Sequence, residues 1–122
     1  MSKRTVVIGA STNPSRYSYS ACQMLNQYNH DFVPVSIKKG SILNKEILNI
    51  KDHPMIDKVD TITLYLSPQN QTEYYEYLLS LNPKRIIFNP GTENQELAKK
   101  AKEKGVETEF ACTLVLLSTG QY

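Results

Sequence analysis

The sequence predicts a doubly wound α/β domain built on a parallel sheet of about five strands. Segments with apolar side chains at helical spacing alternate with short runs rich in β-branched residues, and such runs are typical of parallel strands buried on both faces. The strand-like runs lie at residues 5–8, 32–35, 61–66, 85–88 and 106–110. This alternation implies right-handed crossovers, and 3-2-1-4-5 is the most economical strand order for such a Rossmann-like sheet.

Local signals place the first two helices. Apolar side chains repeat at helical spacing over residues 18–28, and Asn29 ends this helix. Ser67 and Pro68 predict the start of the next helix, because serine is a favoured N-cap and proline fits the first helical position. The predicted buried face of that helix consists of Tyr74, Tyr77, Leu78 and Leu81.

The third helix is expected over residues 93–104. Thr92 and Gln95 match a capping box at its start, and Gly105 is a normal helix stop. Residues 111–117 are apolar and predict a short terminal element, whose last residues either complete the core or pair with another copy of the chain.

The segment at residues 39–58 has no lasting apolar period, because Gly40 and Pro54 interrupt it. We expect loops there, with a short extended piece near Glu46 and Ile47 and one irregular turn of helix.

Composition and charge exclude several classes of protein. Hydrophobic residues make up 40% of the chain and charged residues 21%, which is ordinary for a globular protein. The net charge of +2 is too small to indicate a nucleic acid or a membrane surface as the partner. No apolar run approaches the ~20 residues that a membrane span needs. We therefore expect one domain over residues 1–122.

The two cysteines, Cys22 and Cys112, have neither CxxC nor metal-ligand spacing. No signal peptide precedes the first predicted strand, which begins at Thr5. We expect a cytoplasmic protein with both thiols free in a reducing environment and with no metal site.

The first strand leads into a loop that suits a phosphate. Ligands of open parallel sheets sit beyond the carboxyl ends of the strands. Gly9 lets the backbone turn and approach a ligand closely, and Ala10, Ser11 and Pro14 follow with Arg16 nearby. The next helix would direct its N-terminal N–H groups at the phosphate. Because only one glycine is present, a plain strand-to-helix turn is the alternative.

The end of the second strand separates the nucleotide classes. An NAD site needs an acidic residue there, and the only acid nearby, Asp31, lies at the other end of the strand. Ser36, Lys38 and Lys39 instead suit a phosphorylated ribose, in the 3′-phosphate of CoA or the 2′-phosphate of NADP. Two solvated lysines on a loop are the alternative.

The third and fourth strands end at the same edge of the sheet. Leu66, Ser67 and Pro68 follow the third strand, and Asn89 and Gly91 flank a stiff turn after the fourth. These loops either position backbone groups against a ligand or simply turn the chain.

Candidate catalytic residues are few. His30 and His53 do not fall at carboxyl ends of strands, so no Ser-His-Asp arrangement is indicated. Glu93 fits a first-turn acid that complements the helix dipole better than a catalytic carboxylate. Cys112 follows the fifth strand and has no basic neighbour in sequence that would activate it.

Several segments together carry a family resemblance. They lie at residues 7–11, 16–19, 34–35, 88–94 and 111–117, and the most specific are the Asn-Pro-Gly-Thr-Glu-Asn and Ala-Cys-Thr-Leu-Val-Leu-Leu blocks. The chain resembles, over essentially its whole length, the small stand-alone CoA-binding proteins. Those proteins are single-domain relatives of the CoA-binding domain of the succinyl-CoA synthetase alpha subunit.

The resemblance implies a Rossmann-like domain that binds CoA or an acyl-CoA. Residues of the first loop would line the pyrophosphate, with Arg16 and Lys38 neutralising phosphates and Ser36 near the 3′-phosphoadenosine. Residues after the third strand would cover the adenine or ribose, and those after the fourth would flank the pantetheine. The expected ligand-binding residues are Gly9, Ala10, Ser11, Pro14, Arg16, Ser36, Lys38, Leu66, Ser67, Pro68, Asn89 and Gly91.

Two departures from the family pattern limit these expectations. Ser36 and Ile37 stand before the lysine, where the family usually has another small residue or proline, so the choice between Lys38 and Lys39 stays open. The synthetase also needs a second domain with a phosphorylated histidine and a nucleotide-binding subunit. Nothing after Tyr122 supplies them, so we expect no ligase activity.

The sequence thus favours non-catalytic binding of CoA or an acyl-CoA, by a monomer or a homodimer. One alternative is an NADP-dependent reductase or a CoA-linked transferase that uses Glu93 or Cys112. Another is a redox function in which Cys112 forms a mixed disulfide with the CoA thiol.

Overall fold

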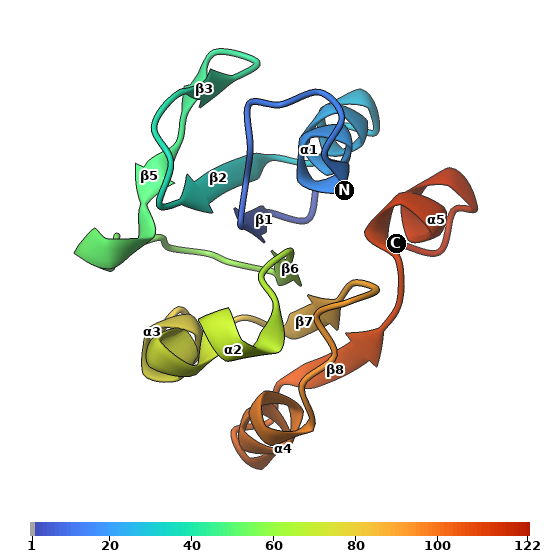
Figure 1. Cartoon of the computed structure of the whole chain (residues 1–122). Helices are drawn as coiled ribbons and strands as arrows, with labels where there is room; N and C mark the ends of the chain where they lie inside the picture. Colours follow the sequence, from blue (N-terminus) through green and yellow to red (C-terminus); the bar gives the residue numbers. More distant parts are fainter. Residues whose placement is uncertain (1) are drawn as a thin grey trace.

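The computed structural model describes residues 2–122 as a parallel sheet between two layers of helices (Figure 1). The sheet has the strand order β5-β2-β1-β6-β7-β8. Its strands are β1 (Thr5–Ile8), β2 (Phe32–Ser36), β5 (Leu48–Asn49), β6 (Thr61–Leu64), β7 (Arg85–Phe88) and β8 (Glu107–Phe110). A separate antiparallel hairpin consists of β3 (Ser41–Ile42) and β4 (Lys45–Glu46). The helices are α1 (Tyr17–Gln27), α2 (Pro68–Gln71), α3 (Tyr75–Ser80), α4 (Gln95–Glu103) and α5 (Thr113–Ser118), with 3₁₀ turns η1 (Ile50–Asp52) and η2 (Thr72–Tyr74).

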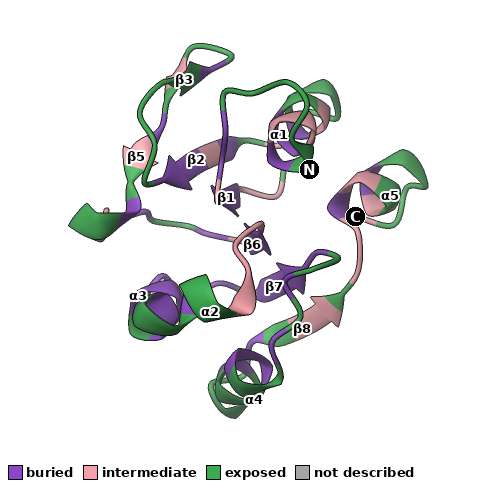
Figure 2. Ribbon diagram, viewed as in Figure 1, coloured by how far each residue is buried: buried purple, intermediate pink, exposed green. Residues whose placement is uncertain are grey.

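Side chains of the central strands alternate between the two helical layers. Val6 and Ile8 share an apolar cluster with residues of α3 and α4, whereas Val7 packs with residues of α1 and α5. Successive residues of a strand point to opposite faces, so β1 supplies both layers. Figure 2 shows β1, β6 and β7 buried between the helices. The α/β class and the parallel sheet are therefore confirmed.

The strand count and the strand order differ from the prediction. The sheet has six strands, because Leu48 and Asn49 form β5 beside β2. The strand at Thr61–Leu64 therefore pairs with β1, whereas the predicted order placed it beside β2 at the edge of the sheet. A strand of two residues is too short to show any periodicity in the sequence, so β5 was not predicted within the irregular segment at residues 39–58. The irregular turn of helix expected there is present as η1.

The capping box predicted at Thr92 is also wrong. Helix α4 begins at Gln95, and its N-cap is Asn94, whose side-chain oxygen accepts a hydrogen bond from the N–H of Leu97 at 3.1 Å. The Thr92 hydroxyl instead donates to the carbonyl of Asn89 at 2.8 Å. Thr92 and Asn94 both have side chains that can cap a helix, but the Thr92 hydroxyl is used within the turn after β7, so Asn94 caps α4.

The terminal element predicted at residues 111–117 is α5. Leu117 is 3% exposed and completes the core that α1 forms with the sheet. No helix in the described residues, 2–122, is long and apolar enough to cross a membrane.

Candidate functional site

The backbone turns sharply at Gly9, directly after β1. Gly9 has a φ of +91°, and the N–H groups of Gly9 and Ala10 both donate to the carbonyl of Val35, at 2.8 and 3.2 Å. A Cβ atom at Gly9 would lie 3.0 Å from the carbonyl carbon and oxygen of Tyr65. Glycine is therefore required here by its backbone conformation and by the close approach of the chain that leaves β6.

The loop that follows Gly9 leads to an open helix terminus. Ser11 is buried, and its hydroxyl accepts from the N–H of Asn13 at 3.0 Å, while the Asn13 side chain accepts from the N–H of Ser15 at 3.0 Å. Arg16 is the N-cap of α1, but no side chain caps the helix and no acid lies in its first turn. The N–H groups at the start of α1 thus have no side-chain partner within residues 2–122, which suits an anion. Pro14 lies exposed in the middle of the loop.

A cavity of about 270 Å³ opens where β1, β2 and β6 end. We name this side of the sheet, where the parallel strands end, the carboxyl edge. Strand order changes direction at β1, and such a switch point is the usual ligand crevice of an open α/β sheet. The cavity is lined by Gly9, Ser36, Ile37, Ile50, Lys51, Leu66, Asn70, Glu73 and Tyr74. Apolar side chains thus meet a few polar groups, a lining suited to a ring system with polar substituents.

Three of the predicted ligand-binding residues, Gly9, Ser36 and Leu66, meet in this cavity. Ser67 and Pro68 follow Leu66 at the start of α2 and are half-buried beside it. The structure does not bring the exposed Lys38 side chain into the cavity lining, although the Lys38 N–H donates to the Ser36 hydroxyl at 3.2 Å.

Sequence reasoning missed six lining residues. They are Ile37, Ile50, Lys51, Asn70, Glu73 and Tyr74. Ile37 directly follows β2, between two residues that were predicted to bind the ligand. Ile50 and Lys51 lie on η1, immediately after β5, and no sequence signal marked them. The others lie within two turns of the predicted helix start at Ser67, so the carboxyl-edge argument could have found them from that cap alone.

Asn89 joins the elements of the other half of the carboxyl edge. Its side chain is 2% exposed and donates to the hydroxyl of Thr63 at 2.7 Å and to the carbonyl of Leu64 at 2.8 Å. It accepts from the N–H of Thr113 at 2.9 Å. Asn89 thereby fixes β6, β7 and α5 relative to one another, and its amide is fully engaged inside the protein.

The turn after Asn89 is exposed at Gly91, which has a φ of +93°. The Gly91 N–H donates to the carboxylate of Glu93 at 2.9 Å. Glu93 therefore stabilises the turn before α4. Its predicted place in the first turn of the helix is wrong, because α4 begins at Gln95 and its first-turn acid is Glu96.

The two thiols lie in different environments. Cys22 is completely buried in α1, and burial raises the pKa of its thiol to about 12, so it stays protonated and inert. Cys112 is half-buried at the N-cap of α5, on the carboxyl edge.

His30 lies at the opposite end of the strands, where its Nδ1 accepts from the N–H of Lys3 at 2.9 Å. Among residues 2–122, no group of His, Cys, Asp and Glu side chains is placed to hold a metal ion.

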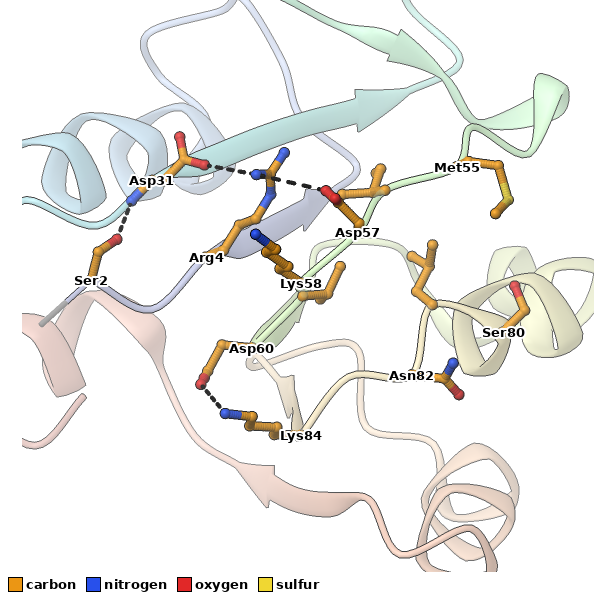
Figure 3. A pocket seen from close by; sticks show the side chains of 13 residues that line it. Ser2, Arg4, Asp31, Met55, Asp57, Lys58, Asp60, Ser80, Asn82 and Lys84 are labelled. Carbon is orange, nitrogen blue, oxygen red and sulfur yellow. Dashed lines mark hydrogen bonds and ion pairs between the residues drawn. The ribbon is translucent and has the colours of Figure 1, made fainter.

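A larger, open cavity of about 1060 Å³ lies where the strands begin, which we name the amino edge. Figure 3 shows Arg4 of this cavity between Asp31 and Asp57, at 3.5 and 4.0 Å, and Lys84 beside Asp60 at 4.0 Å. These charges compensate one another. The cavity also lies on the side of the sheet where α/β proteins do not usually bind ligands. We therefore take the smaller cavity at the carboxyl edge as the candidate ligand site.

A family model described as a CoA binding domain matches residues 3–118. The chain belongs to this family of CoA-binding domains. No curated protein matches the chain. Solved structures with the same fold include that of an uncharacterized protein, 49% identical, which covers 100% of this CoA-binding domain and 99% of the other chain with a TM-score of 0.96.

Two further solved structures resemble this CoA-binding domain. A hypothetical protein from Pyrococcus horikoshii OT3 is 25% identical, with 97% of this chain and 83% of the other covered and a TM-score of 0.84. A protein from Thermus thermophilus is 21% identical, with 99% and 91% covered and a TM-score of 0.85. At that identity, the second likeness concerns the fold alone.

Proposed function

We propose that this CoA-binding domain binds CoA or an acyl-CoA non-covalently in the cytoplasm and does not transform it. The observation that carries the proposal is the junction at Gly9. This residue lines the cavity at the ends of β1, β2 and β6, and it also begins the loop that leads to the uncapped terminus of α1. A nucleotide can therefore place its base in the cavity and its pyrophosphate at the helix terminus.

The cavity suits the adenosine 3′-phosphate end of CoA. Adenine would lie against Ile50, Leu66 and Tyr74, with the 3′-phosphate beside Ser36 and Lys51. Ser67 and Pro68 would cover the ribose side. Because no ion pair within residues 2–122 involves Lys38 or Lys51, both ammonium groups are available to the phosphate.

The rest of the ligand would follow the carboxyl edge towards β7 and β8. The pyrophosphate would contact the backbone of residues 9–11 and Arg16, which has no ion-pair partner among residues 2–122, with Pro14 stiffening the loop between them. The pantetheine would then pass the turn between Asn89 and Gly91. This path follows the residues predicted from the sequence, with the buried Asn89 only anchoring the turn, and it adds Ile50, Lys51 and Tyr74.

Thermal unfolding in the presence of different nucleotides tests the proposal. Saturating ligand stabilises the folded state by RT ln(1 + [L]/Kd), about 2.7 kcal/mol at 100 Kd. We expect CoA and acetyl-CoA to raise the unfolding temperature, 3′-dephospho-CoA to raise it less, and NAD to have no effect. A clear shift with NADP and none with CoA would show that the domain is an NADP protein, such as a reductase.

Cys112 supports a second candidate function, because its thiol is half-buried on the same edge. Its thiolate would attack CoA disulfide, forming a protein–CoA mixed disulfide and releasing one CoA thiol. Intact mass after incubation with CoA disulfide should then show one CoA adduct that Cys112→Ala abolishes. An unmodified wild-type protein would exclude this redox function and leave non-covalent binding intact.

A further inference from the structure

The β3–β4 hairpin packs against the loop of residues 9–16, which joins β1 to α1 (Figure 1). Gly40 lies directly before β3 with a φ of +142°, and a Cβ atom there would lie 2.6 Å from Cγ2 of Thr12. Carbon atoms in van der Waals contact are about 3.5–4.0 Å apart, so no side chain fits between the two segments. Glycine at position 40 therefore allows the hairpin to touch the loop at Thr12.

The hairpin is itself fixed at both of its ends. The N–H of Ile47 donates to the carbonyl of Gly40 at 2.8 Å, which closes the base of the hairpin. Ile47 is buried and shares one apolar cluster with Ala10 of the loop. Near the tip, Nζ of Lys45 lies 2.6 Å from the carboxylate of Asp31, which directly precedes β2. The loop of residues 9–16 thus rests on an element that is attached to the sheet.

The contact at Thr12 lies where the loop still has backbone donors to offer. The N–H groups of Gly9 and Ala10 are already bonded to the carbonyl of Val35. Within residues 2–122, the N–H groups of Ser11 and Thr12 have no hydrogen-bond partner. Successive N–H groups without a partner in the protein form the kind of backbone site that binds phosphate groups.

We propose that the β3–β4 hairpin, through Gly40, positions Thr12 so that the N–H groups of Ser11 and Thr12 bind the pyrophosphate of CoA. This inference rests on the proposed function, which places the pyrophosphate at this loop. Thr12 is exposed, so the contact with Gly40 is what restricts it on the side of the hairpin. A loop that is held in its binding conformation loses less conformational entropy when the ligand binds.

A methyl group at position 40 should displace Thr12. Threonine is β-branched and has few χ1 positions, so we expect the loop to shift in Gly40→Ala. Loss of one hydrogen bond to a charged group corresponds to about tenfold in affinity, and we expect CoA to bind that much more weakly. Adenosine 3′-phosphate has no pyrophosphate and should bind as tightly as to the wild type. A general loss of structure would instead weaken both ligands.

Titrations of the full chain with CoA and with adenosine 3′-phosphate test this inference. Thr12→Ser removes Cγ2, the atom that the new methyl group would meet, and keeps the hydroxyl. The double variant Gly40→Ala, Thr12→Ser should therefore bind CoA as tightly as Thr12→Ser alone. Gly105→Ala is the matched control, because Gly105 also has a positive φ, +78°, but a Cβ atom there would meet nothing within 4 Å. It should bind both ligands like the wild type.

Hydrogen exchange of the wild type gives a second measurement that needs no variant to fold. If the hairpin positions the loop for CoA, CoA bound to the loop must in turn stabilise the hairpin. At the same ratio of ligand to Kd, CoA should slow the exchange of the Ile47 N–H more than adenosine 3′-phosphate does. The N–H of Asn82, which donates to Leu79 and lies at the amino edge, is the control and should exchange equally with both ligands.

The outcomes separate this inference from the proposed function. No binding of CoA to the wild type would refute the proposed function, and the role of the hairpin with it. Three results would overturn the role of Gly40 and leave CoA binding intact: wild-type affinity for CoA in Gly40→Ala, an equal loss for both ligands, or no recovery in the double variant. Equal exchange of the Ile47 N–H with the two ligands would overturn it as well.

Discussion

A side chain at position 9 would destabilise the folded state in two separate ways. A left-handed φ costs a non-glycine residue about 1–3 kcal/mol, and a Cβ atom at Gly9 would also press on the backbone of Tyr65. We expect Gly9→Ala to lower the free energy of unfolding by about 3 kcal/mol or more. Gly105 is the matched control, because its φ is +78° but a Cβ atom there would meet nothing within 4 Å.

Urea denaturation of the two alanine variants measures the difference. Gly105→Ala should lose about 1 kcal/mol, which is the conformational penalty alone. Equal losses in both variants would mean that Tyr65 moves away freely, and that the tight approach of the β6 chain does not determine the residue at position 9.

Lys51 should distinguish CoA from its dephospho form. It lines the cavity with Ser36, and its ammonium group has no ion-pair partner among residues 2–122. We expect Lys51→Ala to weaken binding of CoA about tenfold and binding of 3′-dephospho-CoA less than twofold, since a charge-assisted hydrogen bond contributes about 1.5–3 kcal/mol. Lys100→Ala, on the exposed face of α4, is the control in the same titration. An equal loss for both ligands would remove Lys51 from the phosphate site.

His30 should make the stability of the protein depend on pH below neutrality. Burial, and then the charge of Lys3, holds the pKa of His30 below its ordinary value of 6.5. The unfolded chain therefore takes up the proton first as pH falls. The contribution of neutral His30 is complete above about pH 6.5 and is lost as pH falls through the lower folded-state value.

Thermal unfolding of the wild type and of His30→Gln at pH 7.5 and pH 5 measures the acid-dependent loss of stability that we assign to His30. Glutamine keeps an acceptor for the N–H of Lys3 but cannot be protonated, so the variant should lose less stability between the two pH values than the wild type. The same loss in both proteins would assign the acid sensitivity to other groups.

At the scale of elements, Gln71 connects two loops of the carboxyl edge. It is completely buried, and its amide donates to the carbonyls of Leu66 and Thr92 at 2.8 and 2.9 Å. Its oxygen accepts from Asn94, the N-cap of α4, at 3.0 Å. Gln71→Leu would leave these groups without partners in the core, so we expect a loss of about 3 kcal/mol in urea denaturation. The exposed neighbour Gln69 provides the control, because Gln69→Leu should lower the free energy of unfolding by less than about 0.5 kcal/mol. A similarly small loss in Gln71→Leu would show that the hydrogen bonds of Gln71 do not stabilise the fold.

The elements that the sequence predicted are those with a repeated local signal. The four-residue strands β1, β6 and β7 are buried on both faces, and each is a short run rich in β-branched residues. The start of α2 at Ser67 and Pro68 follows from local capping preferences, and the structure confirms it. Strand β5 has no such signal, because two residues become a strand only through tertiary pairing with β2. Its omission also produced the wrong strand order.

The candidate site could be predicted where it depends on strand ends. Gly9, Ser36 and Leu66 each follow a recognisable strand, and the structure brings them together. Lys51 could not be predicted, because it reaches the cavity through η1, whose position depends on β5. Nor could the sequence show that Asn89 is buried, since its partners Thr63 and Thr113 are far away in the chain.

At the scale of the whole molecule, the two edges of the sheet differ in charge compensation. At the amino edge, Arg4 and Lys84 each lie within 4.0 Å of a carboxylate. At the carboxyl edge, Arg16 and Lys51 have no ion-pair partner within residues 2–122, and the terminus of α1 has no side-chain cap. The edge that lacks internal partners is the one suited to an anionic nucleotide.

Amide chemical shifts recorded during a titration with CoA show directly whether the carboxyl edge binds CoA. We predict the largest changes at residues 9–18, at Ser36, Lys51 and Leu66, and negligible changes at the amino edge. Changes concentrated at Asp57, Lys58 and Asn82, which line the opposite cavity, would assign CoA to the amino edge instead. No change at millimolar CoA would refute CoA binding.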